Sequence, residues 1–127
     1  MKKNKVIISV LLIILMASIL LAVKIKHTAA GFGTVTVEIT DVSGECIRKV
    51  SLEFYEDDTL RGLVENNFNN VVINDGMLMA IENYITPSDW STYICIYVND
   101  VMSEVGINDI DLKDGDIISF RITELTW

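Results

Sequence analysis

The chain has 127 residues, half of them hydrophobic, and a formal net charge of −8 at pH 7. That length has room for one domain and a short appendage. The charge is unevenly placed, because residues 31–127 hold five lysines or arginines and all 18 acidic residues, which gives −13. Nucleic acid phosphates would repel so acidic a domain, which excludes them as partners. The acidic surface serves solubility or, alternatively, cation binding.

Residues 1–30 are predicted to deliver the chain to a membrane. Val6–Val23 is an apolar run that, at about 1.5 Å per residue, spans about 27 Å, close to the thickness of a bilayer's hydrocarbon core. Three lysines precede it, which favours an N-terminus inside and a domain outside the cytoplasm. The run is either a retained anchor at the cell membrane, which we favour for its length, or a signal peptide cleaved near Ala30 to release a secreted domain.

Residues 31–127 are predicted to form one globular domain that begins with a hairpin and a helix. Residues 34–40 alternate polar and apolar side chains, as a half-buried strand does. A Ser43-Gly44 turn leads to a second strand over 47–56, and Asp58 or Thr59 then caps a helix. The side chains expected in the core are Val35, Val37, Ile39, Val50, Leu52, Phe54, Leu60, Leu63, Val64 and Phe68.

The rest of the domain is predicted to be short strands. These cover 71–73, 77–85, 92–98, 101–102 and 116–123, with a turn at 74–76 and a loop over 106–114. Both faces of 92–98 are apolar or aromatic, so we expect it to be a central strand with both faces covered. The order predicts an α+β fold, a β-grasp-like mixed sheet packed on one helix, preceded by the N-terminal transmembrane or signal helix.

The pattern of reactive side chains predicts neither an enzyme nor a metal site. The only histidine, His27, lies outside the domain, and no glycine-rich phosphate loop occurs. The acidic cluster over 109–116 suggests a calcium-binding loop. An EF-hand loop needs a glutamate at its twelfth position, however, and here that position is Phe120, so we expect these acidic residues to form turns. Cys46 and Cys95 lack zinc-site spacing and are either two buried free thiols, which we favour, or a disulfide.

Aromatic side chains crowd around the loop that holds the only proline. Tyr84, Trp90, Tyr93 and Tyr97 flank this loop. A tryptophan in a polar loop either plugs the edge of the core or offers a surface to a flat ligand.

Several motifs in the second half of the domain resemble a known family. They are Trp90, Tyr97-Val98-Asn99, Val105-Gly106 and Leu112 followed by Asp114-Gly115-Asp116. Together they resemble the transcobalamin-like C-terminal domain of exported bacterial proteins, over about residues 35–122. The chain departs from the family's pattern at Asp100, where the family has glycine.

The resemblance implies a domain that, in animal cobalamin carriers, closes over one face of the corrinoid while a large helical domain holds the other. This chain is too short to contain that helical domain. We therefore expect a non-catalytic extracytoplasmic ligand-binding module for cobalamin or another flat molecule, with no certain cofactor. Its predicted ligand-binding residues are Tyr84, Trp90, Tyr93 and Asn99. The alternative is a membrane-anchored surface protein that contacts other proteins through a sheet edge.

Overall fold

The computed structural model describes residues 31–126. The elements are β1 (Gly33–Thr40), β2 (Cys46–Phe54), α2 (Leu60–Asn67), β3 (Val72–Asn74), β4 (Met77–Ile81), β5 (Tyr84–Ile85), β6 (Thr92–Val98), β7 (Val101–Met102), the 3-10 helix η1 (Ile107–Asp109) and β8 (Ile117–Glu124). The predicted apolar helix over Val6–Val23 lies outside the described residues. Within residues 31–126, no helix has the length and apolar character needed to cross a membrane.

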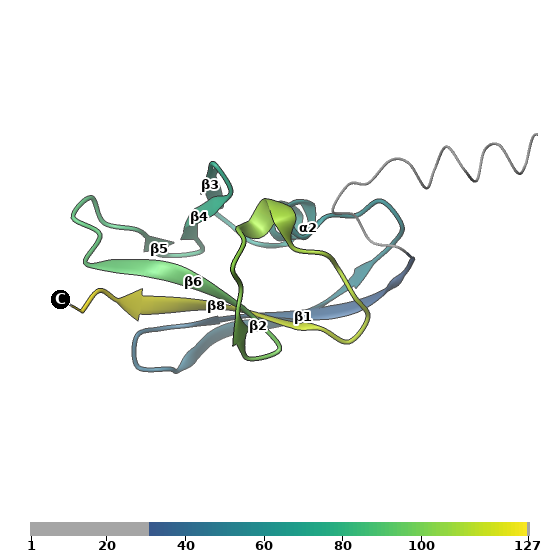
Figure 1. The fold of residues 1–127 in the computed structure, drawn as a ribbon, viewed down its shortest axis with the longest axis horizontal. Helices are drawn as coiled ribbons and strands as arrows, with labels where there is room; N and C mark the ends of the chain where they lie inside the picture. Colours follow the sequence, from purple (N-terminus) through teal and green to yellow (C-terminus); the bar gives the residue numbers. More distant parts are fainter. Residues whose placement is uncertain (1–30, 127) are drawn as a thin grey trace, which may run out of the picture.

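A five-stranded mixed sheet forms the base of the domain (Figure 1), with the strand order β2-β1-β8-β6-β7. The predicted N-terminal hairpin is confirmed, since β1 and β2 pair antiparallel with Val35 opposite Leu52. The first and last strands, β1 and β8, lie side by side and run parallel, while β6 pairs antiparallel with β8. The predicted mixed sheet with one helix is thereby confirmed.

A second sheet, β3-β4-β5, replaces part of the single predicted sheet. The prediction of one strand over 77–85 was wrong, because the chain turns at Glu82, whose φ is +53°. As a result Ile81 pairs with Tyr84 in a tight hairpin. The preceding turn was predicted correctly: Asp75 and Gly76 both have the positive φ of a hairpin turn.

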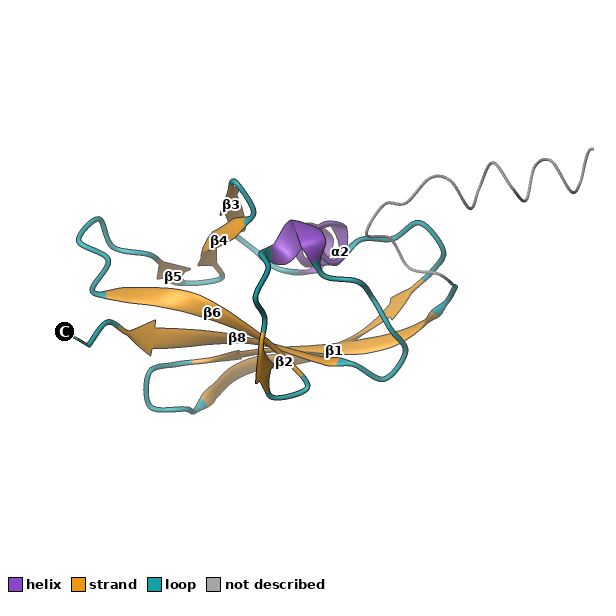
Figure 2. Cartoon of the chain, in the orientation of Figure 1, coloured by secondary structure: helices purple, strands orange, loops and turns teal. Residues whose placement is uncertain are grey.

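Helix α2 and the small sheet lie on the same side of the large sheet (Figure 2). Thr59 begins the helix as predicted, because its Oγ1 accepts a hydrogen bond from the Gly62 N–H at 3.0 Å. The core lies between these layers and contains nearly all the predicted side chains. Its largest fully buried members are Phe120, Ile39, Leu60, Ile81, Ile107 and Ile118. Val50, predicted inside, is partly buried against this core.

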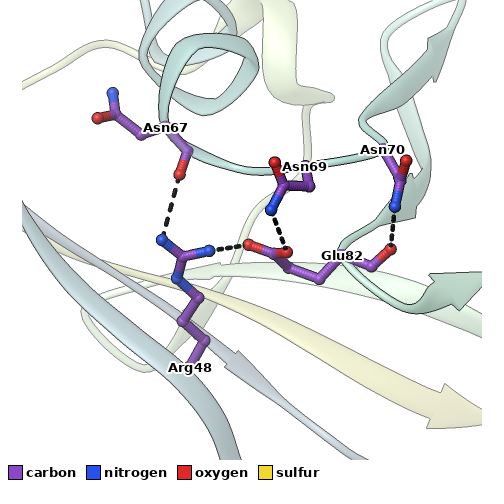
Figure 3. Close-up of polar contacts among 5 residues, drawn as sticks. All are labelled: Arg48, Asn67, Asn69, Asn70 and Glu82. Atoms are coloured by element: carbon purple, nitrogen blue, oxygen red, sulfur yellow. Dashed lines mark hydrogen bonds and ion pairs between the residues drawn. The ribbon is translucent and has the colours of Figure 1, made fainter.

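Arg48 ties the two sheets together on the helix-facing side (Figure 3). It lies opposite Ile39 in the β1–β2 pair, so it shares the core-facing side of the sheet. Its guanidinium lies 4.9 Å from the centre of the Phe68 ring and forms an ion pair with Glu82 in the β4–β5 turn. Glu82 also accepts hydrogen bonds from the amides of Asn69 and Asn70. The small sheet is therefore held to β2 and to the end of α2.

Cys46 and Cys95 are both free thiols. Cys46 pairs with Thr40, Thr40 with Arg121, and Arg121 with Cys95, so the cysteines are three strand spacings apart. At about 4.8 Å per spacing this is roughly 14 Å, well beyond the reach of a disulfide. The expectation that both thiols are buried was wrong for Cys46, which is exposed because it lies on an edge strand.

Candidate functional site

Strand β6 has one open edge. Strand β8 pairs with it over its whole length, whereas β7 covers only Tyr97 and Val98 on the other side. Of the seven residues of β6, only Ile96 is buried. The prediction of a central strand is confirmed, since β6 lies between β8 and β7 in the sheet. Its core-facing side chains Ile94, Ile96 and Val98 pack on the core, and its other face is half-buried. The odd-numbered side chains of β6 lie on the outer face of the sheet, opposite the core. On that face the Arg121 guanidinium covers Tyr97, 3.9 Å from the centre of its ring.

A groove with a volume of about 240 Å³ runs along this open edge. Its walls come from three segments: the start of β4, the edge of β6 and the loop after β7. The residues that line it are Gly76, Met77, Leu78, Tyr93, Ile94, Cys95, Ile96, Met102, Ser103, Val105 and Gly106. Most of these side chains are apolar, and Met77, Met102 and Val105 are each about half exposed. The groove thus offers an apolar surface to a ligand.

Two glycines hold the far wall of the groove together. The Ile107 N–H donates to the Gly76 carbonyl at 3.0 Å, which brings the loop after β7 against the β3–β4 turn. A Cβ added to Gly106 would lie 2.4 Å from the Gly76 carbonyl oxygen, so only glycine permits this approach. The Val105-Gly106 motif is thereby explained as a packing requirement.

Of the four predicted ligand-binding residues, only Tyr93 lines the groove. The neighbouring Cys95 raises the pKa of the Tyr93 phenol above its ordinary value, with a smaller contribution from burial. Tyr84 lies close by, since its hydroxyl is 2.9 Å from the Thr92 Oγ1 at the start of β6. Tyr84 itself is not among the lining residues.

Trp90 lies in the turn that leads into β6. Its backbone N–H donates to the Pro87 carbonyl at 3.0 Å, and its φ is +57°, an uncommon value for so bulky a residue. The side chain is 41% exposed and does not belong to the buried core. Trp90 therefore does not plug the core, and its ring is open to solvent near the Tyr84 end of β6.

Asn99 lies at the opposite end of β6. At about 3.3 Å per residue it is roughly 20 Å from Tyr93, so the structure does not bring it together with the other predicted ligand-binding residues. Its side chain donates to Asp116 and accepts from the Ile117 N–H, both at 2.9 Å. Asn99 and Asp100 have φ values of +51° and +66°, so the turn keeps its two left-handed residues although aspartate stands where the family has glycine.

The acidic residues near β8 are used in turns. Asp114 Oδ1 accepts the Thr34 N–H at 2.9 Å, and the following Gly115 has a φ of +85°. The Asp116 carboxylate accepts the hydrogen bond from the Asn99 side chain described above. Within the described part of the chain, no three histidine, cysteine, aspartate or glutamate side chains are grouped so that they could hold a metal ion.

Of the lining residues, only Tyr93 was predicted as a site residue, and the half-exposed ones among the others are Met77, Met102 and Val105. Met77 and Met102 closely follow the turn signals at 74–76 and 99–100, so both are apolar where a turn meets solvent. That pattern is a usable signal of an exposed apolar surface. It does not predict that the three residues line one groove.

Comparisons with known proteins place the fold. None of the curated proteins matches the chain in sequence. Among solved structures, 17 chains match, including a candidate metal-binding protein from Ruminococcus gnavus with a TM-score of 0.57 and 14% identity, over 74% of this chain and 99% of that one. Haptocorrin in complex with Cbi has a TM-score of 0.58 and 9% identity, and the match covers 74% of this chain and 26% of haptocorrin. At these identities the similarity shows a shared fold.

The predicted resemblance is confirmed at this level, because haptocorrin carries a domain with the fold of the described residues. A sequence family described as a domain of unknown function, DUF4430, matches residues 57–124, which is more than half of the chain. The matched stretch runs from the start of α2 to the end of β8 and includes every segment that lines the groove. The chain belongs to the DUF4430 family, and its described part has a transcobalamin-like fold.

Proposed function

We propose that this protein is a non-catalytic binding module whose ligand lies in the groove along β6. The observation that carries the proposal is the groove itself: an apolar hollow of about 240 Å³ bounded by an open sheet edge and by half-exposed Met77 and Met102. Methionine suits such a surface, since its flexible thioether adapts to irregular ligands. The enzyme alternative lacks support in the groove, whose lining holds Tyr93, Cys95 and Ser103 but no carboxylate or imidazole.

A corrinoid or another flat molecule is the ligand class that we propose first. Support comes from the shared fold with haptocorrin, whose structure contains Cbi, the corrinoid cobinamide. The volume of the groove is below the roughly 300–1,000 Å³ of pockets that enclose a drug-sized ligand. It would therefore cover one edge or face of a corrinoid and leave the rest to solvent or to a partner protein. We expect weak binding by this domain alone, with a Kd of about 10 µM or more.

Titration of residues 31–127 with cobinamide, followed by tryptophan fluorescence, tests this proposal. Free N-acetyltryptophanamide corrects for light absorbed by the corrinoid. Met102→Asp places a charge in the groove and should weaken binding at least tenfold. Val101→Asp is the matched control, because Val101 neighbours Met102, is 69% exposed and does not line the groove. A saturable change that both variants leave intact would contradict the groove as the site.

We further propose that the domain works outside the cytoplasm. Support comes from the apolar run Val6–Val23, with lysines before it and a strongly acidic domain after it. The run would hold the domain at the cell membrane, or cleavage near Ala30 would release it. The mass of the mature protein distinguishes the two, because cleavage removes the first 30 residues.

We propose to classify the fold as β-grasp-like. The support is the parallel pairing of the first and last strands at the centre of the large sheet, with α2 across them. This places the β6 edge on the side of the sheet away from the N-terminal hairpin.

A surface protein that acts through protein–protein contacts is the second candidate function. The open edge of β6 favours it, since an exposed edge strand presents backbone groups that another chain can pair with.

A further inference from the structure

We infer that the open edge of β6 binds an extended polypeptide, which joins the large sheet as an added strand. This inference rests on the second candidate function above and deepens it by naming the class of partner, and it is distinct from the small-molecule site because it depends on backbone groups. The stretch concerned is Thr92–Ile96, about 16 Å long at roughly 3.3 Å per residue.

The backbone N–H and C=O groups of β6 point alternately toward β8 on one side and toward the open edge on the other. The Leu125 N–H donates to Ser91 O, and the Asn99 N–H donates to Ile117 O, so odd-numbered residues face β8. Because antiparallel ladders alternate, the even-numbered residues face the other edge. The Ile96 carbonyl does so, since it accepts the Ser103 N–H at 2.8 Å.

Beyond that bond, the edge is unpaired. No described residue accepts a hydrogen bond from the N–H of Ile94 or Ile96, or donates to the carbonyl of Ile94. These groups lie in a row with the spacing of a strand ladder. Backbone groups in that arrangement are satisfied by water or by a second extended chain, which is the principle of β-strand addition.

The side chains of this edge offer none of the usual protection against pairing. Natural sheets protect edge strands with charged residues, proline or bulges. The opposite edge strand, β2, follows that rule with Arg48, Lys49 and Glu53, and β1 and β2 also shift register near Thr40. The open stretch of β6 reads Thr-Tyr-Ile-Cys-Ile, without a charge or a proline. One edge of the sheet is therefore protected and the other is receptive.

Charge and shape define the partner segment. Asp75 and Glu104 flank lining residues of the groove, both are exposed, and neither has an ion-pair or hydrogen-bond partner among the described side chains. Residues 31–127 carry a net charge of −13. The partner that fits is a short strand with apolar side chains for the groove and a lysine or arginine at its ends.

A synthetic peptide tests the inference. It is a hexapeptide with blocked termini, in which a lysine at each end flanks four alternating valine and threonine residues. Residues 31–127 are suitable, because the Ruminococcus gnavus structure consists of this fold over 99% of its length. The readout is amide hydrogen exchange by NMR. Saturating peptide should slow exchange at Ile94 and Ile96 at least tenfold. Tyr93 and Cys95, already bonded to β8, should change little and serve as internal controls.

Two further peptides separate backbone pairing from other modes of binding. A depsipeptide, with esters in place of the central amides, keeps the side chains but lacks the N–H donors, so it should bind at least tenfold more weakly. A version with glutamate at both ends should also bind at least tenfold more weakly at low salt. Exchange at Ile94 and Ile96 unchanged at saturation, or equal binding of the depsipeptide, would overturn the inference.

A substitution provides an independent readout from the protein side. Ile94→Pro removes the edge N–H while leaving the bonds of Tyr93 and Cys95 to β8, and it should abolish the protection at Ile96. If this variant does not fold, the comparison of the peptide with the depsipeptide on the unmodified protein still tests backbone pairing.

Cobinamide binding by the unmodified protein is measured separately. A peptide that does not bind would therefore overturn strand addition without affecting the test of the corrinoid site.

Discussion

Gly106 shows how one missing side chain shapes the groove. Its Cα lies against the Gly76 carbonyl, and an added Cβ would come within 2.4 Å of that oxygen. Gly106→Ala should therefore break the Ile107–Gly76 hydrogen bond and lower the free energy of unfolding by about 1–3 kcal/mol. Chemical denaturation measures this. Gly31→Ala is the control, because a Cβ there meets nothing within 4 Å; equal effects of both changes would contradict the packing role.

Asp41 gives the β1–β2 turn a dependence on pH. The Ser43 hydroxyl donates to its carboxylate at 2.5 Å, and the backbone N–H groups of Ser43 and Glu45 also donate to it. These bonds lower the pKa of Asp41 below its ordinary value of 3.8. Because the folded-state pKa is depressed, the stabilisation is present above pH 3.8 and is lost as the pH falls through the folded-state pKa.

An NMR titration of the carboxyl groups should therefore place the midpoint of Asp41 below 3.8. Ser43→Ala should move that midpoint upward, because the hydroxyl is the main cause of the shift. A midpoint at or above 3.8 in the unmodified protein would contradict this account of the turn.

At the scale of elements, the Arg48–Glu82 ion pair determines how the small sheet sits on the large one. Arg48→Ala removes this pair and the contact with Phe68 and leaves Glu82, whose side chain is only 17% exposed, without its cation. We expect a loss of about 1–2 kcal/mol of unfolding free energy. Arg61→Ala is the matched control, since its two contacts, the pair with Glu65 one helical turn away and a hydrogen bond to Asn108 Oδ1 at 3.2 Å, are both exposed, and it should cost less, about 0.5 kcal/mol. Similar losses in both variants would show that Arg48 does not hold the sheets together.

The hairpin, the helix and most of the core could be predicted from the sequence, because period-2 alternation and the Thr59 cap are local signals. The break in the predicted strand over 77–85 could not. Its turn depends on the left-handed conformation of Glu82, which contacts with Arg48, Asn69 and Asn70 hold in place. Those partners are far away in the sequence or belong to a different element, so no local sequence pattern predicts these contacts.

The cover of β6 depends in part on a residue from another strand. The alternation of aromatic and aliphatic side chains predicts a strand with both faces covered, and on the outer face Arg121 supplies part of that cover by stacking on Tyr97. The groove itself combines residues 76–78, 93–96, 102–103 and 105–106. Only Tyr93 was identified in advance, because the other walls come together through the close approach of two glycines.

At the scale of the whole molecule, the two cysteines are predicted to stay reduced. Their positions, three strands apart, rule out a bond between them within one chain. Both thiols should therefore titrate with a thiol reagent without prior reduction, the exposed Cys46 faster than the half-buried Cys95. Loss of both thiols in the protein as isolated, recovered only by a reductant, would show pairing between chains or another oxidation.

The fold places one protected and one receptive edge on a strongly acidic domain. The N-terminal hairpin carries charges at its free edge, whereas the groove and the unpaired backbone of β6 lie together at the other side of the sheet. Both the proposed small-molecule site and the inferred strand addition use this side. A ligand of either class would leave the large sheet's core unchanged, as expected for a preformed site.

The most direct test of the central claim is an amide-resolved NMR titration of residues 31–127 with cobinamide. We predict saturable shifts confined to the groove, at Tyr93–Ile96, Met77 and Met102, with little change at Asn99 or in the β1–β2 turn. Absence of saturable shifts would remove the corrinoid from consideration. Saturable shifts centred on another surface would contradict the claim that the groove along β6 is the binding site.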